Sequence, residues 1–489
     1  MLGLCFGLSL AACSDDEVSR RIDAGLQTID GGGSGSDAAL PDAVLIDAPG
    51  TSATIADAAP PDTGVAFSTN FHVALSANAG CAVFTDGRMK CWGASFPGAP
   101  SNVGDGPGEM GANLPFVALN KRVRLVRGGD YSGFCAIFQD GGLRCWAGGS
   151  SGQTSVSTNL LEITRDIDLG TGRTAIDVAI GTGSSCAILD DGSVKCWGFN
   201  SEGELGQGDN TGRPTPPVLP VNLGSGRTAK ALAAGYAFNC ALLDNDRVKC
   251  WGRNGNSIND GGIGGVLAIG NSSHMGNQPN EMGDNLPFAM LGTNPATSAP
   301  WKVLKVVAGR THACALLENN RVKCWGRNDG GGALGSENSI SYGNTPLLVD
   351  DAMPFVNVGT DAANAPWKVA DVDSSESAVC VVLSNGGVRC WGDGGSGATG
   401  RGNTTTIGDS AGEMGNQLPS VELVPGLVGQ RVLATGYSFC VTVGGTSLNC
   451  WGNNANGVLG QELPASGTTR YIGDEVGEMG PTLSTTRLE

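Results

Sequence analysis

The chain has 489 residues, of which 40% are hydrophobic, so it is long enough to bury a large core. Its 79 glycines are more than twice the usual share for this length and indicate many turns. The formal net charge of −17 argues against a nucleic-acid partner, because phosphate binding requires a basic surface.

The first 13 residues, M-L-G-L-C-F-G-L-S-L-A-A-C, are apolar and end in the box Leu10-Ala11-Ala12-Cys13. This segment resembles a bacterial lipoprotein signal, which implies cleavage before Cys13 and lipidation of its thiol. An ordinary signal peptide is the alternative. No other apolar run approaches the ~18 residues that a membrane helix requires, so we expect membrane contact through the lipid alone.

Residues 14–64 are mostly Ala, Asp, Pro, Gly and Ser, with ten acidic residues, two arginines and no aromatic side chain. Such a composition is too polar to form a core and predicts a disordered tether. Like-charge repulsion and prolines should keep this tether extended.

Residues 65–489 form an array of seven repeats, each with two cysteines and a tryptophan directly after the second cysteine. The pairs are Cys81 and Cys91, Cys135 and Cys145, Cys186 and Cys196, Cys240 and Cys250, Cys314 and Cys324, Cys380 and Cys390, and Cys440 and Cys450. Repeats of about 60 residues with strand signals alone predict a β-propeller and not a helical solenoid.

Each pair frames a predicted β-hairpin, as between Cys186 and Cys196, where an apolar run is followed by Asp190-Asp191-Gly192 and Val194. A three-residue loop of the type I plus bulge kind needs a positive φ at its third residue. The occupants of that position are Gly87, Gly141, Gly192, Asp246, Asn320, Gly386 and Thr446, and only Thr446 fits poorly.

Counting residue pairs back from this loop places the two cysteines opposite each other at a non-hydrogen-bonded position. The Cα separation there, about 4.5 Å, suits a disulfide. We therefore predict seven cross-strand disulfides, each worth about 2.5 to 3 kcal/mol by chain entropy. Paired thiols can instead bind zinc, but this spacing and the three histidines of the chain do not match zinc patterns. Disulfides require an oxidising, extracytoplasmic compartment.

Other segments of the repeat predict further strands. Apolar stretches before the hairpins, such as Ala175 to Gly181, Ala229 to Gly235 and Lys302 to Gly309, are expected to be the innermost strands. Segments opened by Leu114, Leu286, Met353 and Leu418 follow the hairpins and predict outer strands, where proline at the second position is tolerated.

Two runs carry a family resemblance: T-H-A-C-A-L-L-E-N-N-R-V-K-C-W-G-R-N-D-G-G-G-A-L-G from Thr311 and C-W-G-F-N-S-E-G-E-L-G-Q-G from Cys196. They resemble repeats of the regulator of chromosome condensation family. The resemblance covers about residues 65–489 and implies an all-β, seven-bladed β-propeller, here with one cross-strand disulfide per blade. It also implies a rigid face that binds protein.

The residue before the second cysteine is basic in six repeats: Lys90, Arg144, Lys195, Lys249, Lys323 and Arg389. These side chains would form a ring able to hold an anionic ligand or an acidic protein. The alternative is structural, with each long stem covering apolar surface while its charged end reaches solvent.

A turn with the sequence E-M-G recurs at Glu109, Glu281, Glu413 and Glu478, and Asp105, Asp409 and Asp474 precede three of these turns. Carboxylates at this spacing can share Ca²⁺, whereas a turn that packs beside the outer strand is the alternative without a cofactor. His72 and His274 are isolated in the sequence, and His312 is expected to form a structural hydrogen bond. We expect no enzyme activity because no catalytic motif occurs.

Together these features predict a monomeric, lipid-anchored, extracytoplasmic propeller that binds a protein or another surface ligand. An envelope enzyme acting on polysaccharide and a structural surface protein are the alternatives. The long loops from Asn254 to Leu286 and from Gly330 to Met353 are the predicted recognition face. The two ends of the array should meet, with Leu483 to Leu488 near the segment Phe67 to Leu75, because closure removes exposed strand edges.

Overall fold

The computed structural model describes residues 71–94, 103–129, 133–147, 166–255, 264–328, 331–445, 447–461 and 471–488. These residues all belong to one compact unit, Ala58–Glu489. The predicted signal segment with Cys13, the tether at 14–64 and the first residues of the array lie outside the described residues. In the described part of the chain, no helix is long and apolar enough to span a membrane.

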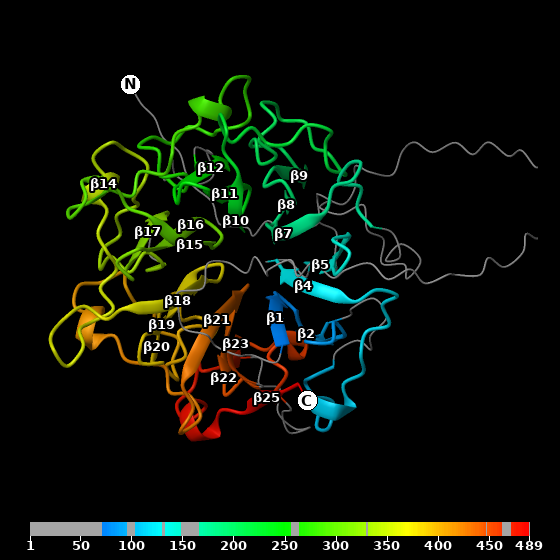
Figure 1. Ribbon diagram of the computed structural model, residues 1–489. Helices are drawn as coiled ribbons and strands as arrows, with labels where there is room; N and C mark the ends of the chain where they lie inside the picture. Colours follow the sequence, from blue (N-terminus) through cyan, green and yellow to red (C-terminus); the bar gives the residue numbers. More distant parts are fainter. Residues whose placement is uncertain are drawn as a thin grey trace, which may run out of the picture. The chain divides into compact units, whose positions relative to one another are not determined.

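Seven antiparallel sheets, here called blades 1 to 7, repeat along the chain (Figure 1). Their inner strands are β1 (Phe71–Ser76), β4 (Val123–Gly128), β7 (Ala175–Ile180), β10 (Ala229–Ala234), β15 (Val303–Ala308), β18 (Val369–Ser374) and β21 (Gly429–Thr435). The second strands are β2 (Ala79–Phe84), β5 (Gly133–Phe138), β8 (Ser184–Leu189), β11 (Phe238–Leu243), β16 (His312–Leu317), β19 (Ala378–Leu383) and β22 (Ser438–Val443). The third strands are β3 (Met89–Gly93), β6 (Leu143–Ala147), β9 (Val194–Gly198), β12 (Val248–Gly252), β17 (Val322–Gly326), β20 (Val388–Gly392) and β23 (Ser447–Asn453).

Short elements complete the described secondary structure. A small hairpin joins β13 (Thr293–Asn294) and β14 (Ala299–Pro300), while β24 (Tyr471–Ile472) and β25 (Thr485–Arg487) both pair with β23. The 3-10 turns are η1 (Gly111–Asn113), η3 (Gly283–Asn285), η4 (Asp350–Ala352), η5 (Gly415–Gln417), η6 (Ala455–Gly457) and η7 (Gly480–Thr482).

The blades close into a ring. Each inner strand contacts the inner strand of the next blade, and β21 of the last blade contacts β1 of the first (Figure 1). The fold is therefore an all-β, seven-bladed propeller, as predicted. The predicted inner strands are confirmed as β7, β10 and β15, and the two ends of the array meet between blades 7 and 1.

The predicted hairpin register is also confirmed. Leu189 N–H donates to the carbonyl of Ser193, and Cys186 lies opposite Cys196. All seven predicted cysteine pairs are disulfides, with Cα separations of 4.0 to 4.1 Å. Each disulfide therefore joins the second and third strands of one blade, and these cysteines are buried.

The turn residues follow the predicted conformation in six blades. Gly192 has φ of 76°, and Asp246 and Asn320 have φ of 62° and 58°. In blade 7, Thr446 lies outside the described residues, whereas Gly444 and Gly445 have φ of 60° and 83°. Glycine at the first two loop positions thus supplies the left-handed backbone in the blade whose third loop residue is threonine.

The predicted outer strands occupy the expected place but are less regular than expected. Val356 N–H donates to the carbonyl of Val322, for example, yet the segment from Met353 is not a continuous strand. Proline at the second position lacks an N–H group, which weakens pairing. The far end of the segment is also held elsewhere, because the carbonyl of Val358 accepts a hydrogen bond from Arg389 of the next blade. Only blade 7, with β25, forms a three-residue outer ladder among the described segments.

Candidate functional site

The basic side chains before the second cysteine join neighbouring blades. The Lys323 ammonium donates to the carbonyl of Leu291 in blade 4 at 2.8 Å and to that of Asp350 in its own blade at 3.0 Å. The side chain is 2% exposed, and burial lowers the pKa of Lys323 to about 8.

The other members of this set are placed alike. Carbonyls of the preceding blade's outer segment accept hydrogen bonds from Lys90, Lys195, Lys249 and Arg389, and Arg144 donates to Asn120 and Asp166. Each of these six side chains donates at least one hydrogen bond to the protein itself, although Nε of Arg389 is buried without a hydrogen-bond partner. Their geometry supports the structural interpretation over a ligand ring.

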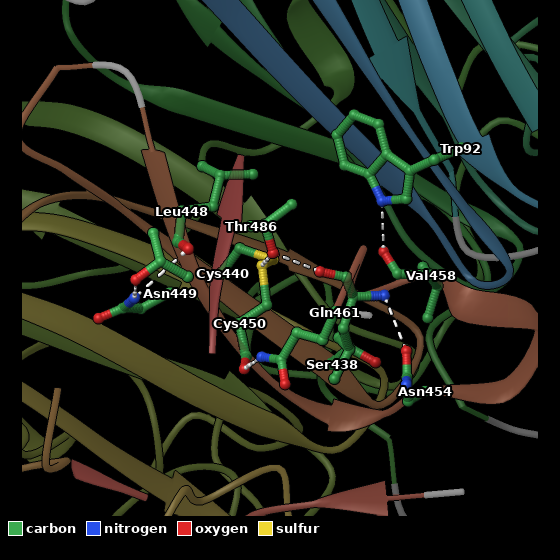
Figure 2. Close-up of a disulfide and its surroundings, with 12 residues drawn as sticks. Trp92, Ser438, Cys440, Leu448, Asn449, Cys450, Asn454, Val458, Gln461 and Thr486 are labelled. Carbon is green, nitrogen blue, oxygen red and sulfur yellow. Dashed lines mark hydrogen bonds between the residues drawn. A yellow bond between two sulfur atoms is a disulfide. The ribbon is translucent and has the colours of Figure 1, made fainter. Parts of the chain in front are cut away.

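In blades 1, 4, 5, 6 and 7 the tryptophan after the second cysteine makes a second link to the preceding blade. The indole N–H of Trp251 donates to the carbonyl of Glu204 at 2.9 Å, and that of Trp325 donates to Val266 at 2.8 Å. At the closing boundary, Trp92 of blade 1 donates to Val458 of blade 7 at 2.8 Å (Figure 2). Lysine and tryptophan together therefore join blades 1, 4 and 5 to their predecessors, and the pair in blade 1 closes the ring.

The glutamates of the E-M-G turns bind backbone amides. One carboxylate oxygen of Glu281 accepts hydrogen bonds from the N–H groups of Gly276, Asn277 and Gln278 at 2.9 to 3.0 Å. Glu109, Glu413 and Glu478 accept bonds in the same way. The contacts match the packed-turn interpretation. In the part of the chain that the structure describes, no group of three or more candidate ligands is placed to hold a metal ion.

Two histidines, the buried His312 and the half-buried His72, are structural residues. His312 Nε2 lies 2.7 Å from Ser374 Oγ, and burial lowers the pKa of His312 to about 4. His72 Nε2 lies 3.0 Å from the carbonyl of Val126, and burial, with Arg127 nearby, lowers the pKa of His72 to about 3. The predicted structural hydrogen bond of His312 is therefore confirmed.

A basin of about 600 Å³ opens on one face of the ring, where the inner and second strands of each blade turn into each other. Residues of blades 3 to 7 line it, among them Glu202, Tyr236, Arg253, Arg310, Thr311, Arg327, Glu376, Asp393 and Tyr437. The lining is mainly polar, so the basin suits a charged or hydrogen-bonding ligand.

Backbone hydrogen bonds lock the floor of the basin. Tyr236 N–H donates to the carbonyl of Arg310, Arg310 N–H donates to Glu376, and Glu376 N–H donates to Gly436, at 2.8 to 3.1 Å. Turns from four successive blades, 4 to 7, are thus joined edge to edge. Because the disulfide-linked blades hold each turn, this surface is formed before any ligand binds.

Charged and aromatic side chains meet in the basin. The guanidinium groups of Arg253 and Arg310 lie 5.3 and 5.4 Å from the centroid of the Tyr236 ring. Arg310 also lies 3.7 Å from a carboxylate oxygen of Glu376, and the Arg310 side chain is 48% exposed. Cations at this distance from an aromatic face are attracted to it, which orients both arginines.

The basin was not predicted residue by residue. Of the two loops expected to form the recognition face, the second contributes Gly331 and Ala333, and residues 256–263 of the first lie outside the described residues. Both loops also pair with the third strand of their own blade, through Met275 with Gly252 and Tyr342 with Gly326. The sequence signal for the basin is the position two residues before the second strand, which is Tyr236 in blade 4, Arg310 in blade 5 and Glu376 in blade 6.

Sequence and structure comparisons identify the repeats. The Regulator of chromosome condensation (RCC1) repeat matches residues 175–204, 229–257 and 303–331, and a second description of the same repeat matches residues 191–242. The chain therefore carries regulator of chromosome condensation repeats within residues 175–257 and 303–331, in blades 3 to 5 of the propeller. This confirms the predicted resemblance.

Relatives with these repeats include much longer proteins. The chain is 30% identical to the E3 ubiquitin-protein ligase HERC2 of Homo sapiens over 210 residues, which are 42% of this chain and 4% of that protein. It is 24% identical to the ultraviolet-B receptor UVR8 of Arabidopsis thaliana over 270 residues, 55% of each chain. The chain thus spans a small part of the first relative and about half of the second.

A solved structure of such repeats has the same fold. Yeast RCC1 (Prp20), in a crystal structure with Kap60, matches with a TM-score of 0.55 at 16% identity. The match covers 86% of this chain and 90% of that chain. At this identity the likeness concerns the fold.

Proposed function

We propose that this chain is an extracytoplasmic, lipid-anchored propeller that binds another protein at the basin. The observation that carries the proposal is the preformed polar basin to which five blades contribute. Binding surfaces commonly lie on loops that a rigid scaffold holds in place. We propose a monomer, because one ring supplies the whole basin.

The compartment is inferred from the disulfides. The chain has seven disulfides, and all of their cysteines are buried. Disulfides form and persist in oxidising compartments, which favours a location outside the cytoplasm. The Leu10-Ala11-Ala12-Cys13 box then supplies the proposed attachment to the envelope. The acidic tether at 14–64 would hold the propeller away from the membrane surface.

A protein partner is the class that fits the basin best. Yeast RCC1 (Prp20), which has the same fold, is crystallised with Kap60 bound, so a protein with this fold can have a protein partner. In this chain the basin is wide and polar, and its turns are held by neighbouring blades. Such a surface can meet a protein segment without first becoming ordered.

One observation favours the alternative that the protein is an enzyme. Glu376 and Asp393, both of blade 6, line the basin, and a polysaccharide-cleaving enzyme needs two carboxylates. Glu376, however, is 6% exposed and ion-paired with Arg310, which gives it a structural partner in the basin wall. We therefore propose a binding role without catalysis.

Site-directed photocrosslinking in the native envelope tests the proposed function. A photoreactive amino acid replaces Thr311 in the basin or, as a control, Asp191 in a hairpin turn at the opposite ends of the strands. We expect a discrete crosslinked protein from position 311 and none from position 191. No adduct from position 311, or the same adducts from both positions, would refute a binding basin.

A further inference from the structure

The basin carries charges of both signs in separate places. Arg253 of blade 4, with Arg310 and Arg327 of blade 5, contributes guanidinium groups, whereas Glu376 and Asp393 of blade 6 contribute carboxylates. Glu202 of blade 3 lines the other side of the arginines. A positive centre is therefore flanked by negative side chains.

The positive centre is suited to a carboxylate. Arg253 and Arg310 both lie beside the Tyr236 ring and both line the basin, so one aromatic side chain holds two guanidinium groups near each other at this surface. A guanidinium group matches a carboxylate through two parallel hydrogen bonds. Arg310 already has one carboxylate nearby, because an oxygen of Glu376 forms an ion pair with it at 3.7 Å, which is longer than a hydrogen bond.

The surrounding charges select among anionic ligands. A uniformly anionic polymer would meet the carboxylates of Glu202, Glu376 and Asp393 beside the arginines, and the net charge of −17 would repel its remainder. A segment with both signs avoids this repulsion, because its basic side chains can face the same carboxylates. Charge complementarity of this kind gives specificity and orientation.

From this arrangement we propose that the basin binds a peptide segment of a partner protein in which acidic side chains are flanked by basic ones. The acidic side chains enter between Arg253, Arg310 and Arg327, and the basic ones face Glu202 on one side and Asp393 on the other. This inference rests on the proposed protein-binding function and adds the charge pattern of the partner.

Four fluorescein-labelled peptides of equal length test the charge pattern with the purified full chain. Their centres are Lys-Glu-Glu-Lys, four glutamates, four lysines or four serines, in the same glycine-serine background, and binding is measured by fluorescence anisotropy at low salt. We expect the Lys-Glu-Glu-Lys peptide to bind tightest. We expect Arg310→Gln and Arg253→Gln each to weaken its binding about tenfold, because each change removes a charge-assisted contact.

Arg173→Gln is the matched control. Arg173 is likewise exposed and paired with carboxylates, those of Asp190 and Asp191, but lies beside the hairpin turn at the opposite ends of the strands. We expect Arg173→Gln to leave binding unchanged. Arg310→Gln also removes the ion pair of the nearly buried Glu376 carboxylate, so binding of all three variants is compared at a temperature well below their unfolding midpoints.

Several outcomes would overturn the proposal. They are equal or tighter binding of the four-glutamate peptide, undiminished binding to both basin variants, and no binding of any peptide. The crosslinking experiment separates the two ideas. An adduct from position 311 together with any of these outcomes would leave the binding function standing and remove the proposed charge pattern.

Discussion

Replacing Lys90 with methionine probes how the ring is closed. Lys90 of blade 1 is 4% exposed, and its ammonium donates to the carbonyls of Leu488 in blade 7 at 3.0 Å and Gly111 in blade 1 at 2.8 Å. Blades 1 and 7 lie at opposite ends of the described sequence, so non-covalent contacts hold them together. Methionine keeps most of the stem and removes the charge.

The expected cost is about 2 kcal/mol. A hydrogen bond to a charged group contributes about 1.5 to 3 kcal/mol, but removing the ammonium also removes the penalty for burying a charge. Gly111 O keeps a second donor, the N–H of Leu114, whereas the link to Leu488 is lost.

Lys249→Met supplies a control of matched chemistry. The Lys249 ammonium also bridges two blades, through the carbonyls of Leu223 and Gly283 at 3.0 and 2.7 Å, and lies 4.9 Å from the centroid of Phe288. Lys90 lies 5.0 Å from the centroid of Phe116 in the equivalent place. The two variants therefore remove comparable hydrogen bonds and a comparable aromatic contact, but blades 3 and 4 remain joined by the chain.

Hydrogen exchange of the native protein measures the difference. An opening free energy lowered by about 2 kcal/mol accelerates exchange about 30-fold. We expect this acceleration in β1 and β25 of Lys90→Met and not in the same strands of Lys249→Met. Equal exchange of β1 and β25 in the two variants would show that the ring does not open at this boundary.

Three further changes test the account by chemical denaturation. Replacing Cys186 and Cys196 together with alanine should cost about 2.7 kcal/mol, the chain entropy released from a loop of about ten residues; a cost near zero would contradict a bond formed in the native protein. The pKa of His312 is lowered to about 4, so its neutral form is favoured by folding. Stability from this site is present above pH 6.5 and is lost as the pH falls to about 4, and His312→Gln should flatten that part of the profile. Burial raises the pKa of Glu204, so stability from its carboxyl is present below the usual pKa and lost as the pH rises; Glu204→Gln should therefore stabilise the protein at pH 7.5 and lose this advantage in acid.

Local features of the fold could be predicted because each repeat encodes them over short distances. The turn Asp190-Asp191-Gly192 sets the hairpin register, and that register alone places Cys186 opposite Cys196. Alternating apolar residues likewise locate the inner strands. Seven copies of the pattern reinforce one another, so the number of blades follows from the repeat.

Contacts between blades could not be predicted in the same way. Lys90 and Leu488, whose carbonyl accepts its hydrogen bond, are 398 residues apart in the sequence. No local sequence pattern identifies the carbonyl that a lysine reaches. The sequence therefore leaves two roles open for this lysine, a ligand ring and a structural contact. The basin escaped prediction for a related reason, because Tyr236, Arg310 and Glu376 become neighbours only when successive blades pack side by side.

Non-reducing peptide mapping, with intact mass measurement, on protein from its native membrane fraction tests whether the chain is a lipid-anchored, extracytoplasmic propeller. We expect seven disulfides, each within one repeat, and an amino-terminal peptide that begins with lipidated Cys13. Free thiols together with an unprocessed amino terminus would contradict an anchored, extracytoplasmic propeller.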